Sequence, residues 1–81
     1  MAKKKETKPK ELKALAKAVR LLREKANLSQ EDLADRAEID RTYVSGIERG
    51  MRNPSLRVLI RVADGLGVTL ATLAKNIEQS R

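Results

Sequence analysis

The chain has 81 residues, which is enough for one small folded domain and too few for two. It contains no cysteine and no histidine, which excludes disulfides, thiolate or imidazole metal sites, cysteine nucleophiles and histidine bases. The net charge is +7 and lies entirely at the front, because residues 1–25 hold ten Lys and Arg against three acids while residues 26–81 hold eight of each. A basic front end favours a polyanion such as nucleic acid, with an acidic membrane surface or a merely solvated tail as alternatives.

The first residues are too polar and too charged to bury anything, so we predict a disordered basic arm at 1–8 and a single domain at 9–81. Pro9 suits the first position of a helix, where a missing N–H costs nothing. Apolar residues then recur with the spacing of an amphipathic helix, which predicts a helix over residues 9–26. Asn27 tolerates the left-handed conformation that ends a helix.

Two short helices are predicted next. Ser29 opens the string SQED, a serine cap with an acid three residues on, which places the start of the second helix at Gln30. Asp40 is in position to cap a third helix over residues 41–49, with Val44 and Ile47 facing inward.

Two further helices complete the chain. Gly50 ends the third helix, and Ser55 caps a fourth whose apolar residues lie on two faces, so we expect that helix to be buried nearly all round. Gly67 ends it, and Thr69 caps a fifth helix. The predicted fold class is therefore all-α, a compact domain of five helices without strands. No stretch approaches the roughly 20 apolar residues of a membrane span, and no secretory signal follows the N-terminal lysines.

Residues 29–49 have the layout of a helix-turn-helix, in which the second helix lays its N-terminal residues into the major groove of DNA. An arginine such as Arg41 can bond guanine at two acceptors, and the Thr42 methyl can contact a thymine methyl. Tyr43 can reach a phosphate or a base edge. Ordinary structural roles remain open for each: an unpartnered surface arginine, a half-buried tyrosine, and at Gly46 tight helix packing in place of close approach to DNA.

The strings LSQEDLADRAEIDRTYVSGIERG and NPSLRVLIRVADGLGV resemble the phage-repressor Cro/C1 family, also called Xre, over about residues 15–75. The segment DRTYVSGIER is especially similar to small members such as the controller proteins of restriction-modification systems. The resemblance implies a lambda-repressor-like fold and a homodimer that binds a roughly palindromic operator in double-stranded DNA. It also implies a cytoplasmic, nucleoid-associated protein of a bacterium or phage.

The resemblance further implies roles for individual residues. Bases would be contacted by Arg41, Thr42, Tyr43, Ser45 and Gly46, and the DNA backbone by Gln30, Arg49, Arg52 and Asn53. A buried ion pair of the family falls on Arg23 and Glu48. The chain departs from the family at Glu38, where glycine is common, and a left-handed glutamate would cost on the order of 1 kcal/mol.

We therefore predict a transcription regulator, with an antitoxin or bridging protein of the same fold as the alternative. The fifth helix is the candidate dimer surface, through Leu70, Leu73 and Ile77, unless these side chains simply close the core. An enzyme is not expected, because Glu31, Asp32 and Asp35 suit dipole partners and solvated surface better than a metal cluster. No metal, cofactor or small-molecule ligand is expected. Because several acids lie near the predicted DNA face, we expect non-specific attraction to depend on the arm and the first helix.

Overall fold

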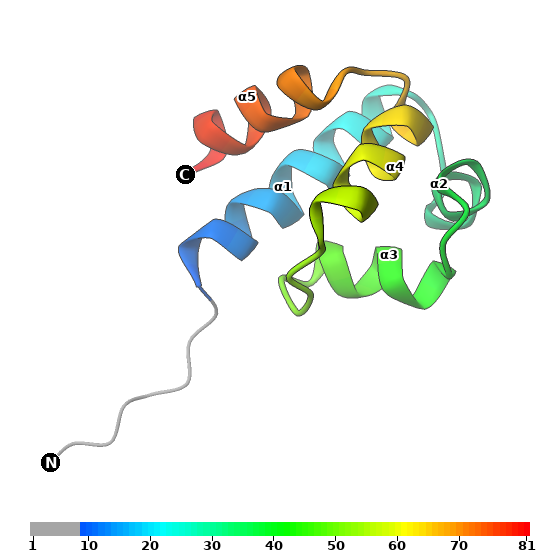
Figure 1. The fold of residues 1–81 in the computed structure, drawn as a ribbon, viewed down its shortest axis with the longest axis horizontal. Helices are drawn as coiled ribbons and strands as arrows, with labels where there is room; N and C mark the ends of the chain where they lie inside the picture. Colours follow the sequence, from blue (N-terminus) through cyan, green and yellow to red (C-terminus); the bar gives the residue numbers. More distant parts are fainter. Residues whose placement is uncertain (1–8) are drawn as a thin grey trace, which may run out of the picture.

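The computed structural model describes residues 9–81, so the predicted arm at 1–8 lies outside the described residues. Within that range the chain forms five helices and no strand, which confirms the predicted all-α class (Figure 1): α1 Lys10–Lys25, α2 Gln30–Ala37, α3 Arg41–Glu48, α4 Leu56–Leu66 and α5 Leu70–Ser80. Helix α5 runs back along α1, while α4 packs on α2, and α3 bridges α1 and α2. None of these helices is long and apolar enough to cross a membrane.

The helix ends lie close to the predicted signals. Helix α1 begins at Lys10, so Pro9 precedes the first helical position and does not occupy it. Asn27 has φ 59° and turns the chain after α1, as predicted. The hydroxyls of Ser55 and Thr69 accept the backbone N–H groups three residues on, at 3.2 and 3.0 Å, and cap α4 and α5.

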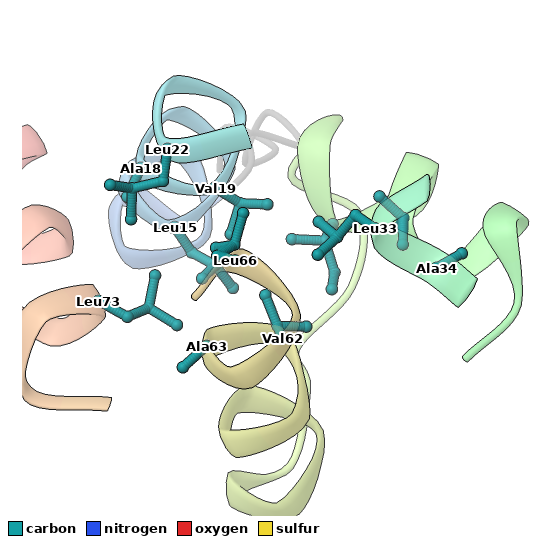
Figure 2. Close-up of a cluster of buried hydrophobic side chains, with 12 residues drawn as sticks. Leu15, Ala18, Val19, Leu22, Leu33, Ala34, Val62, Ala63, Leu66 and Leu73 are labelled. Atoms are coloured by element: carbon teal, nitrogen blue, oxygen red, sulfur yellow. The ribbon is translucent and has the colours of Figure 1, made fainter. Parts of the chain in front are cut away.

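The core draws on all five helices. Figure 2 shows side chains from α1, α2, α4 and α5 converging on one cluster, with Leu33 reaching in from α2 and Leu73 from α5. Its largest fully buried members are Leu33, Ile47, Leu73, Val19, Val44 and Val62. A shared core of this kind fixes the position of α3 relative to α1 and α2, because closely packed interiors deform little.

The prediction that α4 is buried nearly all round is wrong. Leu56 is 63% exposed and Ile60 is 42% exposed, although Val62 and Ala63 are buried. Helix α4 packs mainly against α2 and makes fewer contacts with α5, and this packing leaves Leu56 and Ile60 largely uncovered. An apolar side chain on a second helix face is buried only when another element reaches it.

Candidate nucleic-acid interface

Helix α2 begins with a complete capping box. The Ser29 hydroxyl accepts the backbone N–H of Asp32 at 2.9 Å, and the Asp32 carboxylate accepts the backbone N–H of Ser29 at 3.0 Å. The hydrogen bond that the Asp32 carboxylate accepts from the Ser29 backbone, and after it the interaction with the Ser29 side chain, lower the pKa of Asp32. The start of α2 predicted from the string SQED is thereby confirmed.

The turn from α2 to α3 depends on a strained residue. Glu38 has φ 57° and ψ 46°, the left-handed conformation that glycine adopts without steric cost. The turn therefore has the left-handed conformation at position 38 even though the residue there is a glutamate and not a glycine. Asp40 precedes α3 in an extended conformation, but its side chain makes no capping hydrogen bond, so the predicted cap is wrong in that respect.

The outer face of α3 is open to solvent. Arg41, Thr42 and Arg49 are exposed, and Ser45 is partly exposed. Together these four side chains line a shallow hollow of about 240 Å³ that runs along the helix. Val44 and Ile47 point the other way and are buried, as predicted. The outer face of α3 therefore presents a row of exposed hydrogen-bonding side chains, and its inner face is anchored in the core.

Arg52 packs against α3 over Tyr43 and Gly46. Its guanidinium carbon is 4.9 Å from the centre of the Tyr43 ring, a cation–π arrangement. Its side chain also covers Gly46, where an added Cβ would lie 2.8 Å from the Arg52 Cγ. Gly46 is therefore buried and presents no surface to a base in this arrangement. The absence of a Cβ at Gly46 allows the Arg52 side chain to approach α3 closely. The spacing of residues in the sequence could not predict this contact.

A buried ion pair joins α1 to the end of α3. Arg23 donates from Nε to Glu48 Oε2 at 2.6 Å and from Nη2 to Oε1 at 2.9 Å. Burial by itself raises the pKa of Glu48, but the hydrogen bonds from Arg23 and Gln30 and the charges of Arg23 and Arg20 outweigh it, so the pKa is lowered. The hydrogen bond to Glu48 likewise raises the pKa of Arg23.

Gln30 belongs to this buried network. Its Nε2 donates to Glu48 Oε1 at 3.0 Å, so part of the amide predicted to contact the DNA backbone is already engaged inside the protein. Arg52 and Asn53, also predicted backbone contacts, are exposed in the loop before α4. The family resemblance implied the pairing of Arg23 with Glu48, but no signal in the sequence indicated Gln30 as a further partner.

The prediction that Leu73 contributes to a dimer surface is wrong. Leu73 is completely buried in the core, so it offers no surface to a second copy. Leu73 lies on the side of α5 that packs against α1, and its side chain is part of the apolar core. Leu70 and Ile77 are half-buried.

Known proteins share this arrangement. A family model described as helix-turn-helix matches residues 19–73, which is more than half of the chain. The chain belongs to the helix-turn-helix family. The resemblance to Cro/C1-type members noted in the sequence is confirmed by this match. It extends beyond the two short helices to the C-terminal part of α1, all of α4 and the start of α5.

Members of the helix-turn-helix family that act as control proteins are similar over most of the chain. Control protein C.MunI of Mycoplasma sp is 48% identical over 63 residues, covering 78% of this chain and 85% of the relative. The crystal structure of the restriction-modification controller protein C.AhdI from Aeromonas hydrophila aligns with a TM-score of 0.76 and 40% identity, covering 78% of this chain and 96% of that one. The restriction-modification controller protein C.Esp1396I, solved as a tetramer with its natural 35 base-pair operator, aligns with a TM-score of 0.81 and 31% identity, covering 86% and 92%.

Structures of C.Esp1396I also exist with single replacements of an arginine, a threonine and a tyrosine at consecutive positions, and of a second arginine eleven positions after the first. This chain has the same residue types at the same spacing, in Arg41, Thr42, Tyr43 and Arg52. In the folded chain the first three of these residues lie in the first turn of α3, and Arg52 lies in the following loop with its guanidinium over the Tyr43 ring.

Proposed function

We propose that this protein is a transcription regulator that binds operator DNA in a sequence-specific manner, as a homodimer, in the cytoplasm. The observation that carries the proposal is the open face of α3, where Arg41, Thr42, Ser45 and Arg49 line one hollow. A helix presents such side chains to base edges when it enters the major groove, whose pattern of donors and acceptors differs for each base pair.

The roles of the side chains follow from their chemistry. Arg41 and Thr42 lie in the first turn of α3, the part of a helix-turn-helix that reaches deepest into the groove, and we assign them to base contacts together with Ser45. Arg49 and Asn53 are exposed at the far end of α3 and in the next loop, and we assign them to phosphates. Arg52 holds the Tyr43 ring by its cation–π contact, and we infer that the two act together.

A second copy has a place to bind. Leu56 and Ile60 lie four residues apart on α4, so they share one helix face, and both are exposed. Covering adjacent apolar side chains is favourable at about 25 cal/mol per Å². The tetramer of C.Esp1396I on its operator supports assembly on DNA for a chain of this fold. We therefore infer that the two copies meet through this face of α4, with Leu70 and Ile77 as further candidates.

The experiment that tests the proposal is selection from a random duplex library at near-physiological salt, because charge attraction and base reading differ in their salt dependence. We expect recovery of an inverted repeat, whose two half-sites match a symmetric dimer. Recovery of no motif would contradict the proposal and would point to a protein-interaction module of the antitoxin or bridging type.

Two single variants distinguish the recognition of bases from non-specific electrostatic attraction to DNA. Arg41→Ala should lose discrimination by about 1–3 kcal/mol at one base position of each half-site, whereas Arg49→Ala should weaken all sequences alike and lower the salt slope by about 1 for each bound copy. Lys75→Ala, an exposed residue of α5, is the control. Equal and sequence-blind losses in the first two variants would overturn the assignment of α3 to base reading.

A further inference from the structure

A second hollow lies at the opposite end of α3 from Arg41, between that end and α1. Its volume is about 300 Å³, and its lining is rich in cations: Lys13, Ala16, Lys17, Arg20, Glu48, Arg49 and Gly50. At 1.5 Å per residue, Arg49 is roughly 12 Å along the helix from Arg41. The hollow is therefore separate from the bases that the first turn of α3 would reach.

Three of the four cations around this hollow have no ion-pair partner among residues 9–81. The single carboxylate in the lining is Glu48, which is already bonded by Arg23 and Gln30. Arg20 is steadied by Glu48, with 3.6 Å between Nε and Oε1, yet its side chain is 53% exposed. Among residues 9–81 no ion pair involves Lys13, Lys17 or Arg49. The local charge is therefore positive and faces solvent.

This hollow is continuous with the face of α3. Arg49 lines both the second hollow and the one formed with Arg41, Thr42 and Ser45. Lys13 and Lys17 in turn line a third hollow together with Lys10 and the C-terminal Arg81. We call the set Lys10, Lys13, Lys17, Arg20 and Arg49 the α1 track.

We propose that the α1 track binds backbone phosphates of the same DNA duplex outside the bases contacted by α3. This proposal rests on the proposed function. A row of exposed cations that spans several helix turns matches a ligand whose negative charges repeat along its length, as in duplex DNA. A single small anion would occupy one hollow and leave the others unused. Contacts of this kind add affinity and fix register without reading sequence.

The test compares two double variants on two duplexes. Lys13→Gln with Lys17→Gln removes two charges from the α1 track, and Lys25→Gln with Lys75→Gln removes two charges from exposed sites outside it. One duplex carries the selected operator with long flanks on both sides, and the other ends at the outermost selected base pairs. Affinities are measured over a range of salt concentrations with the full chain.

On the flanked duplex, the track variant should bind more weakly than the control variant, and its salt slope should fall by about 2 for each bound copy, or about 4 for the dimer. On the trimmed duplex the two variants should bind alike, with the operator preference unchanged. Equal behaviour of both variants on the flanked duplex would overturn the proposal. So would saturable binding of inorganic phosphate at the track, seen in amide NMR shifts, with no dependence of DNA affinity on flank length. Failure of the library selection would contradict the proposed function itself. The comparison of the two duplexes starts from a selected operator, so its outcome contradicts only the role of the α1 track.

Discussion

Arg23 and Glu48 form a two-bond ion pair that ties α1 to the last residue of α3, at 2.6 and 2.9 Å. The Glu48 side chain is 1% exposed and that of Arg23 is 13% exposed. Arg23 also donates to the carbonyl of Leu28, at 2.8 Å, so a single guanidinium connects α1, the loop before α2, and α3. These polar contacts reinforce the orientation of the helix-turn-helix that the shared apolar core fixes.

Removing the arginine should therefore be costly. Arg23→Met leaves Glu48 buried without its main partner, and we expect the free energy of unfolding to fall by about 3–5 kcal/mol in urea denaturation. The double variant Arg23→Met with Glu48→Leu should recover part of this loss, because no buried charge remains. Additive losses in the double variant would contradict the ion pair as the source of the effect.

Stability should depend on pH through Glu48. Because its pKa is lowered in the folded state, its contribution is complete above the ordinary glutamate value of about 4.3 and is lost as the pH falls through the folded value. Asp32, whose pKa is also lowered, contributes with the same sign. Urea titrations between about pH 7 and pH 3 should show a plateau followed by a fall.

In the same titrations Glu48→Gln should be less stable at neutral pH and lose less on acidification than the unsubstituted chain. Asp64→Asn, an exposed acid of α4, is the charge-matched control. A Glu48→Gln curve that ran parallel to the unsubstituted one would show that this carboxyl does not drive the acid sensitivity.

The turn between α2 and α3 should be improved by glycine. Glu38→Gly removes the steric cost of the left-handed conformation, and after the greater entropy of glycine in the unfolded chain we expect a gain of roughly 0.5–1 kcal/mol. Asp35→Gly, three residues earlier inside α2, should lose up to about 1 kcal/mol instead. Thermal unfolding of both variants gives the comparison, and a loss at position 38 would rule out backbone strain there.

The two helical glycines should respond in opposite directions to alanine. A Cβ at Gly65 would lie 2.9 Å from Leu33 Cδ1 and 3.2 Å from the Ala37 backbone nitrogen, so Gly65→Ala should cost about 1–3 kcal/mol. At Gly46 the close neighbour is the flexible Arg52 side chain, which can move away. Gly46→Ala should leave stability unchanged or raise it by up to about 1 kcal/mol. Equal losses in calorimetry would contradict this difference.

The exposed face of α4 gives a prediction for assembly. Ile60→Lys places a charge where we expect a second copy, so sedimentation equilibrium should show a shift from dimer toward monomer at a given concentration. Leu21→Lys makes the same change at an exposed site of α1 and should leave the dimer intact. If Ile60→Lys left the dimer intact, this face of α4 would not be part of the dimer interface.

Local signals in the sequence determined most of the secondary structure. The Ser29 cap with Asp32, the caps at Ser55 and Thr69, and the turn at Asn27 act within a few residues, so their effects can be read along the chain. The exposed face of α3 followed from the same periodicity, once Val44 and Ile47 had been assigned to the core. The family resemblance supplied the pairing of Arg23 with Glu48.

Only the tertiary structure decided which apolar faces are covered and which polar side chains are already engaged. Periodicity shows that Leu56, Ile60 and Leu73 lie on apolar faces, but the packing of other helices decides that Leu73 is buried and the other two are exposed. The contacts of Arg52 with Tyr43 and Gly46, and of Gln30 with Glu48, join residues nine, six and eighteen positions apart. Such contacts depend on the relative positions of whole elements, which the core fixes and which no local pattern specifies.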